Sequence, residues 1–317
     1  MNHRKKYLHN HLAESTLLLP LCSVVALLLW LFRVWQNQPD EVGDWVGAGM
    51  SLTLVMLTML VVTETTNTFQ IIRARTRSAA AIVVLLLSLQ LSSPMDWPAL
   101  VPALLMTISY ALIYRSYQQH EAPGSFFYAT FFYSVSSLCA PILLALFPAY
   151  LFYQTVFMRA MSRRTLVAGL LGAALPYVAW WTGCFLMDEP CRLIPHVGLE
   201  DLWQQSLLHT TFSTPLQGLM WGCLGYYSVV GVLHYWRSNY SDKIRTRQMC
   251  YVYVCQTVLV NLLIFFDPSH FDVYAPILVV SLATLLAHYL TLTRSRWALL
   301  QGIICTILFL HLMSAVL

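Results

Sequence analysis

The chain has 317 residues, of which 58% are hydrophobic and only 10% are charged, and its formal net charge is +4. A soluble domain carries about 25% charged residues, and a soluble fold could not cover so apolar a chain with polar surface. The basic residues are scattered through short loops, so no nucleic-acid partner is expected. The composition predicts a protein in contact with the lipid bilayer.

Apolar runs near twenty residues recur along the chain, which is the pattern of a polytopic, all-α transmembrane helical bundle. The first run follows a basic head, is long for a signal peptide and lacks a cleavage site, so it is expected to be a retained span. Residues 1–317 would form a single integral membrane domain of about eleven spans. The predicted spans are 16–36, 45–69, 78–93, 97–115, 122–139, 141–158, 165–186, 216–236, 248–266, 273–293 and 297–316.

The stretch from Ser125 to Met158 has no charged residue and could form one helix or two. One helix would be about 51 Å long, against a hydrocarbon core of about 30 Å. Pro141 offers a break, because proline cannot donate to the preceding turn and restricts the residue before it. Two spans are therefore predicted, of which the fifth, 122–139, is expected to be short and open to kinking or incomplete crossing.

The charge distribution gives an independent test of this hairpin. With the N-terminus in the cytoplasm and the C-terminus outside, eleven spans place sixteen of the eighteen basic residues on the inner side, which is the positive-inside pattern. A single helix would turn the later basic segments 159–164, 237–247 and 294–296 outward. The hairpin is therefore preferred, and the outer face becomes acidic.

The first outer loop, QNQPDEVGDW, places Asp40, Glu41 and Asp44 between two spans. Carboxylates this close at a membrane surface can bind a divalent cation or act as a general base. They are the candidate catalytic residues, and beyond that possible cation no cofactor is expected. Pro39-Asp40 and Gly43-Asp44 are also ordinary turn dipeptides, so a solvated turn is the simpler interpretation.

The longest outer loop, 187–215, contains GLEDLWQQSLLHTTF, which is typical of an amphipathic helix lying in the membrane interface. Trp203 would anchor that helix at headgroup depth. In a functional interpretation the helix is a lid, and Trp203 and His209 bind substrate. The alternative is a connector with no further role.

Glu64 lies within VVTETTNTFQ, about one turn from the inner end of the second span. An acid at membrane depth is a candidate for substrate binding. Arg73, Arg75 and Arg77 follow shortly after, so an ordinary ion pair is the alternative.

Eight cysteines occur without a CxxC pair, so no metal site is predicted. Cys184 and Cys191 both approach the outer side and could form a disulfide if that side is oxidising.

Few other polar groups lie at membrane depth. Arg33 is expected to extend toward water, and Gln256 and Asn261 are expected to hydrogen-bond between helices. Gly169 and Gly172 predict close helix packing. No chain of buried acids and histidines, such as proton-coupled carriers use, is evident.

Three elements in order resemble an uncharacterised polytopic inner-membrane family of Bacteroidota: TTNTFQIIRARTRS, SFFYATFFYSVSSLCAPILLALFPAYLF and MRAMSRRTLVAGLLGAALPY. The resemblance covers about residues 15–180. It implies a location in the bacterial inner membrane and brings no activity or catalytic residue.

A fainter resemblance is to membrane glycosyltransferases that use polyprenol-phosphate sugars, where a span is also followed by a hairpin and a basic inner turn. That resemblance implies a catalytic carboxylate in the first outer loop, which here would be Asp40, Glu41 or Asp44. The family's loop is long and carries juxtamembrane helices, whereas this loop has about eight residues. No large soluble acceptor-binding domain follows.

Together these features favour a protein that handles cell-envelope lipid or lipid-linked glycan, in the manner of a reduced glycosyltransferase, with a lipid-linked substrate as its partner. One alternative is a non-enzymatic subunit or scaffold that meets membrane-protein partners within the bilayer. The other is a transporter or flippase.

Overall fold

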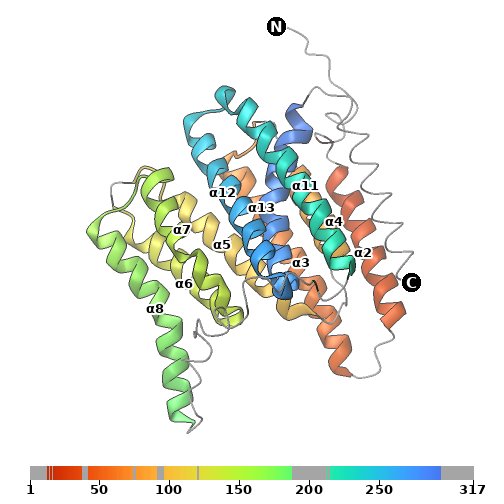
Figure 1. Cartoon of the computed structure of the whole chain (residues 1–317), viewed down its shortest axis with the longest axis horizontal. Helices are drawn as coiled ribbons and strands as arrows, with labels where there is room; N and C mark the ends of the chain where they lie inside the picture. Colours follow the sequence, from red (N-terminus) through yellow and green to blue (C-terminus); the bar gives the residue numbers. More distant parts are fainter. Residues whose placement is uncertain are drawn as a thin grey trace.

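The computed structural model describes residues 13, 15, 17–37, 42–73, 76–90, 96–119, 121–187, 212 and 215–293. In this part of the chain all regular structure is helical (Figure 1). The α-helices are α2 (Leu18–Asn37), α3 (Val42–Phe69), α4 (Ser78–Gln90), α5 (Val101–Arg115), α6 (Pro123–Cys139), α7 (Phe147–Phe152), α8 (Arg163–Leu186), α11 (Pro215–Ser238), α12 (Ile244–Phe266) and α13 (Phe271–Leu292).

The predicted all-α membrane class is confirmed at this level. Six of the described helical segments are long and apolar enough to cross a membrane, and helices occupy the first ten predicted spans. The eleventh, 297–316, lies outside the described residues. The count of eleven spans and the side of each terminus remain predictions.

The predicted hairpin near Pro141 is present. Helix α6 ends at Cys139, and Ala140 is extended, with φ −144° and ψ 94°. The chain then returns along α6, since the rings of Tyr133 and Tyr150 lie 4.4 Å apart. The amide of Gln118, before α6, donates to the carbonyl oxygen of Met158 at 2.8 Å. One continuous helix is incompatible with these contacts.

The fifth span was expected to be short and open to kinking; α6 is indeed short, at 17 residues, but it is a regular helix. The irregularity falls on the sixth segment, which runs through a 3₁₀ turn (Pro141–Leu146), α7 and a π turn (Tyr153–Phe157). Pro141 and Pro148 each stand in the first turn of a new piece. Because proline donates no amide hydrogen, the helix restarts at each one.

The core of the bundle is α13, which packs against α4, α5, α11 and α12. In the most apolar 18-residue stretch of α13 and the turn before it, 83% of the stretch is buried inside the protein. The corresponding fraction for α8 is 17%. Figure 1 shows α13 among these helices, with α8 and α2 at opposite edges. After Asp272 the helix has no charged residue and many small ones, so it can be surrounded by other helices at low cost.

A tyrosine-rich layer fills the space between α5, α6, the sixth segment and α12. The rings of Tyr110 and Tyr150 stack with centroids 5.6 Å apart. The hydroxyl of Tyr153 donates to Gln256 Oε1 at 3.3 Å, which confirms the predicted inter-helix role of Gln256. Phenolic rings supply apolar area, and their hydroxyls fasten neighbouring helices.

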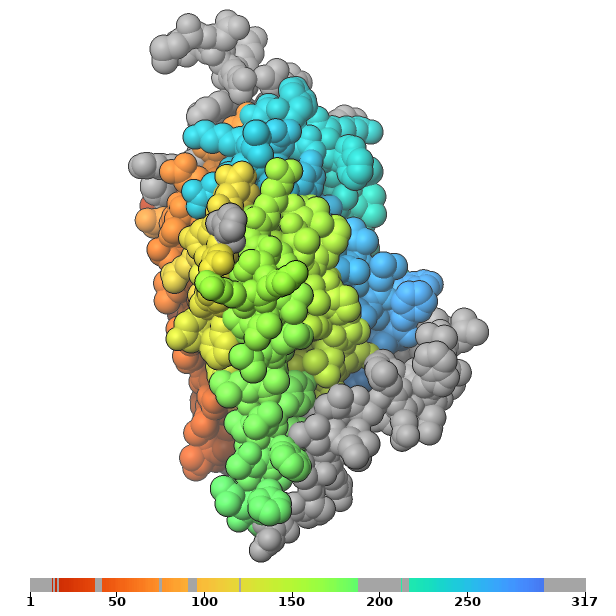
Figure 2. All heavy atoms as spheres, turned by 90° about the vertical axis from the view of Figure 1, so that its left-hand side faces the viewer, coloured from red at the N-terminus to blue at the C-terminus, as the bar shows by residue number. Residues whose placement is uncertain are grey.

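Helix α8 packs closely on α6, as the glycines predict, and otherwise lies on the outside of the bundle (Figure 2). A Cβ atom at Gly169 would lie 2.3 Å from a ring carbon of Phe126. At Gly172 it would lie 2.3 Å from the carbonyl oxygen of Phe127. Only glycine permits this approach of the two backbones.

The predicted inner segments meet at one end of the bundle, which we call the Asp242 end. Arg73 lies 2.8 Å from Asp242, and Thr246 donates to the carbonyl oxygen of Gln70 at 3.4 Å. Glu121 and Arg164 form an exposed ion pair at 3.1 Å. We call the opposite end, where α11 and α13 begin, the Asp272 end. The alternation of ends agrees with the topology that the charges predict.

Arg33 was expected to extend toward water, but it does not. It is buried, and its Nη2 donates to the carbonyl oxygen of Leu89 at 2.8 Å. Helix α4 ends one residue later, at Gln90. The guanidinium therefore satisfies a terminal carbonyl, where a cation also meets the negative end of the helix dipole.

Candidate functional site

The predicted site residues fall in different parts of the molecule. Asp44 is half-buried in the first turn of α3. Asp40, Glu41, Trp203 and His209 lie outside the described residues, as does the interfacial helix proposed for 187–215. Their predicted roles in catalysis and substrate binding therefore remain predictions.

Glu64 is exposed and accepts a hydrogen bond from Thr68 at 2.8 Å. Arg73, one of its suggested partners, pairs with Asp242 instead. Cys184 lies in the last turn of α8, whereas Cys191 is outside the described residues, so the disulfide stays a prediction. Among the described side chains no group of three or more His, Cys, Asp or Glu residues could hold a metal ion.

A groove lies between α11 and α12. Both helices pack along α13 but touch one another at few points, and the space left between them is about 540 Å³. We call it the lateral groove. Its apolar walls include Trp221, Val229, Leu233, Val258, Leu262 and Phe265.

One polar pair lies within the lateral groove. Asn261 Nδ2 donates to Ser228 Oγ at 3.1 Å and to the carbonyl oxygen of Thr257 at 2.7 Å, which confirms its predicted inter-helix role. Gly225 lies in the groove beside this pair, and a Cβ atom there would make only an ordinary contact, 3.9 Å from Asn261 Oδ1. The groove can hold an apolar chain with no donor left unsatisfied on the Asn261 amide.

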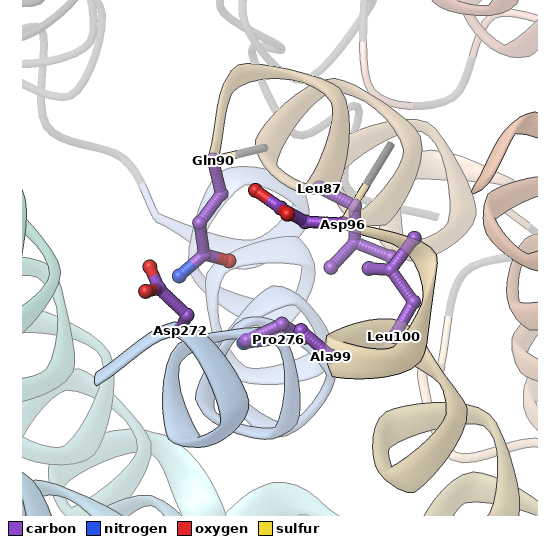
Figure 3. Close-up of a pocket in the computed structure, with 7 residues that line it drawn as sticks. All are labelled: Leu87, Gln90, Asp96, Ala99, Leu100, Asp272 and Pro276. Atoms are coloured by element: carbon purple, nitrogen blue, oxygen red, sulfur yellow. The ribbon is translucent and has the colours of Figure 1, made fainter. Parts of the chain in front are cut away.

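A small polar cavity lies at the Asp272 end (Figure 3). Its volume is about 20 Å³, which fits one water-sized group. The carboxamide of Gln90 points between the carboxylates of Asp96 and Asp272. Both polar atoms of Gln90 are buried and lack a hydrogen-bond partner in the described chain. The cavity is too small to enclose a sugar ring, although a hydroxyl or ammonium group would fit.

The same end carries a local cluster around Asp267, directly after α12. His270 Nδ1 lies 2.8 Å from Asp267 Oδ2, and the hydroxyl of Tyr274 donates to that oxygen at 3.0 Å. Burial works to raise the pKa of the Asp267 carboxyl, but hydrogen bonds from His270 and Ser269 outweigh it and leave that pKa below its usual range. The charged carboxylate fixes the turn between α12 and α13.

At the Asp242 end a second carboxylate is buried beside Arg73 and His288. The side chain of Asp242 is 1% exposed; its Oδ1 lies 2.8 Å from Arg73 Nε, and its Oδ2 lies 3.1 Å from His288 Nε2. Burial works to raise the pKa of the Asp242 carboxyl, yet His288 and Arg73 outweigh it and leave that pKa lowered. The carboxylate is therefore charged at neutral pH and ties the α3–α4 turn, the α11–α12 loop and α13 together.

Sequence reasoning missed this cluster. The prediction that the chain lacks a relay of buried acids and histidines is not contradicted by the single contact between His288 and Asp242. The available signal was one acid, Asp242, within a loop that otherwise carries only basic charges. Its partners, Arg73 and His288, lie far away in the sequence, so only the packing of the helices brings them together.

Protein-family models, curated proteins and solved structures were compared with this chain, and none matches it.

Proposed function

We propose that this chain is a multi-pass protein of the bacterial inner membrane that handles cell-envelope lipid or lipid-linked glycan. The observation that carries the proposal is the lateral groove between α11 and α12. Its volume falls within the range of about 300–1,000 Å³ that is usual for ligand pockets. Its occupant is the hydrocarbon chain of a lipid from the surrounding bilayer.

The walls of the groove favour a hydrocarbon chain over water. Val229, Leu233 and Val258 are 58%, 52% and 46% exposed, so the groove opens to the outside of the bundle. Val258 lies on α12, which is long and apolar enough to cross a membrane. Val229 and Leu233 lie on the facing helix α11, which has 24 residues. Apolar surface at that depth is covered by lipid chains, and a groove admits a chain more fully than a flat helix face does.

The Asp272 end suits the polar part of such a molecule. Gln217, one turn before Trp221 on α11, donates to both carboxylate oxygens of Asp272 at 3.2 Å. A chain in the groove thus ends near Asp272, Asp96 and Gln90. Hydroxyl groups of a glycan donate well to carboxylates and exchange hydrogen bonds with a carboxamide. The proposal keeps Asp40, Glu41 and Asp44 as the candidate catalytic or cation-binding carboxylates.

Glycine substitutions in α11 test the proposal. The protein is purified in a mild detergent, and its bound lipids are identified by native mass spectrometry. Gly225→Phe places a ring in the groove, and Gly222→Phe adds the same ring one turn away, where a Cβ atom meets nothing within 4 Å. We expect wild type and Gly222→Phe to retain a bound lipid chain and Gly225→Phe to lose it.

Two outcomes count against lipid handling. In one, Gly225→Phe retains lipid at the wild-type level while its thermal unfolding matches that of Gly222→Phe. In the other, wild type carries no lipid beyond that of the detergent-exchanged background.

The buried ion pair favours a flippase as the second candidate, because ionisable groups at membrane depth often line transport pathways. His288 of α13 is such a group, and its partner Asp242 lies in the adjoining α11–α12 loop. Transfer of a fluorescent lipid between the leaflets of reconstituted vesicles distinguishes this activity from chain binding alone.

A further inference from the structure

Two histidines lie side by side next to Asp242. His288 of α13 is 2% exposed, and its ring centroid is 5.7 Å from that of His234 on α11. His288 Nε2 faces Asp242, whereas its Nδ1 is buried and has no hydrogen-bond partner in the described chain. His234 Nε2 is also buried and has no hydrogen-bond partner in the described chain. These nitrogens can gain or lose a proton without breaking an existing hydrogen bond.

Several elements contribute titratable or charged groups around the two imidazoles. The α3–α4 turn supplies Arg73, which pairs with Asp242. Helix α11 supplies Tyr235, whose ring lies 5.2 Å from that of His288, and α13 supplies Tyr289, 4.9 Å from His234. Helix α12 supplies Cys250, whose thiol contacts the carbonyl oxygen of Ile71 at 3.7 Å. Of the described groups placed here, Asp242 alone is a carboxylate.

The protonation state of His288 changes its bond to Asp242. A neutral imidazole donates a hydrogen bond to the charged carboxylate, whereas an imidazolium donates the same bond and adds the attraction between opposite charges. A second proton on His234 would place two like charges in neighbouring rings, which disfavours the doubly charged state. The geometry therefore accommodates one proton on the two rings.

We propose that His234 and His288 form a site that binds one proton, and that the bound proton tightens the Asp242 end of the bundle. The carboxylate of Asp242 is the point where the α3–α4 turn, the α11–α12 loop and α13 are joined. A stronger hydrogen bond between His288 and Asp242 holds α13 more firmly to the two loops. Loss of the proton weakens this hydrogen bond and so loosens α13. The inference goes beyond lipid handling and requires no molecule in the lateral groove.

The pH range of a stability change distinguishes proton binding by the histidines from proton binding by Asp242. Because the folded pKa of Asp242 is lowered, its own contribution to stability is complete at neutral pH and is lost only as the pH falls through that value, below about 4. Imidazoles ordinarily titrate between about pH 5 and 8. A stability change between pH 6 and 8 that depends on His288 therefore reports proton binding by the imidazoles.

The test is the thermal unfolding of the purified full chain in lipid nanodiscs, from pH 6 to 8, in wild type and His288→Gln. Glutamine retains a donor near the position of Nε2 but does not titrate. We expect the wild-type melting temperature to exceed that of the variant by a gap that widens as the pH falls. For one proton, the folded-to-unfolded ratio changes by at most about tenfold per pH unit.

Two further variants separate proton binding from packing. In an Asp242→Asn background, His288→Gln should produce a gap that no longer depends on pH, because the charged partner is gone. His234→Gln should move the wild-type transition to higher pH, because the competing imidazole is removed. A purely structural role for His288 predicts a constant gap in every background.

A gap between wild type and His288→Gln that is constant from pH 6 to 8 overturns the proposal. If His288→Gln does not yield folded protein, nitrogen NMR of histidine-labelled wild type decides the matter. The spectra should contain one imidazole pair that titrates as a unit and that is perturbed by His234→Gln. Buried imidazole signals that stay fixed over this range would equally refute the proton site.

Discussion

The α6–α8 pair and the α11–α12 pair use glycine in opposite ways. Helix α8 places Gly169 and Gly172 against α6, where an added Cβ atom would collide at 2.3 Å. Helix α11 carries Gly222 and Gly225, and neither would bring a Cβ atom closer than 3.9 Å to a neighbour. The first pair is held along its length, and the second leaves the lateral groove.

A small residue on a membrane helix therefore permits close approach without requiring it. The two helix pairs differ in the position of the contacts that join them. Between α6 and α8 they run through the middle, with Ser134 donating to the carbonyl oxygen of Ala173 at 2.5 Å. The α11–α12 pair is joined mainly through α13 and through Asp242 in its connecting loop. Substitutions at these contacts test the contrast between the two pairs.

The largest effect is expected from Asp242→Ala, which removes the carboxylate that joins the α11–α12 loop to Arg73 and His288. Breaking a buried ion pair costs about 3–5 kcal/mol, and because Arg73 is partly exposed we expect about 3 kcal/mol less stability. Glu121→Ala, which breaks the exposed ion pair with Arg164, is the control and should change the free energy of unfolding by about 1 kcal/mol or less. Equal losses in a denaturation assay would contradict an ion-pair joint at the Asp242 end.

The next effect concerns the closely packed pair. Gly172→Ala forces a methyl group against the carbonyl oxygen of Phe127, so α6 and α8 must separate, at a cost of about 1–3 kcal/mol. Gly183→Ala, on the same helix, meets nothing within 4 Å and should be neutral or stabilising. The two melting temperatures are compared in the same detergent. A stable Gly172→Ala protein would mean that backbone contact does not hold this pair.

A smaller effect is expected where α8 begins. The side chain of Ser162 accepts a hydrogen bond from the amide of Thr165 at 3.1 Å. Ser162→Ala removes this N-cap and should cost about 1 kcal/mol. Ser162→Asp restores an acceptor and should recover most of the loss, as measured by thermal unfolding. No recovery with Asp would show that the hydroxyl acts through some contact other than the cap.

Sequence reasoning predicted the features that depend on local physics. Uncharged length and Pro141 predict the hairpin, and the alternation of charges predicts which loops share an end. The central position of α13 follows less directly, because a lipid-facing helix and a buried helix are both apolar. The shortness of α6 could be predicted, but the breaks in the sixth segment could not, since neighbouring helices decide how its two prolines disturb it.

The candidate sites were less predictable for the same reason. A groove is a property of two helices that fail to meet, and Gly225 is indistinguishable in sequence from Gly172. Asp242, Arg73 and His288 come from three distant segments, and their meeting depends on the whole bundle. Asn261 could be predicted as an inter-helix donor because an amide at membrane depth needs a partner wherever the helices place one.

The smallest expected effect is that of Gly→Ala in α11. Alanine should stabilise the protein at Gly225 of α11, whereas it should destabilise the protein at Gly172 of α8. Gly225→Ala should leave stability unchanged or raise it by about 0.5–1 kcal/mol, since alanine favours helix and its methyl group meets only an ordinary contact. Gly231→Ala, on the same helix, meets Leu285 Cβ at 3.3 Å and should be slightly destabilising. The order of unfolding free energies should be Gly225→Ala, then Gly231→Ala, then Gly172→Ala as the least stable. A Gly225→Ala protein as unstable as Gly172→Ala would mean that α11 and α12 close on each other in the membrane, and the groove would then be absent where a lipid chain must enter.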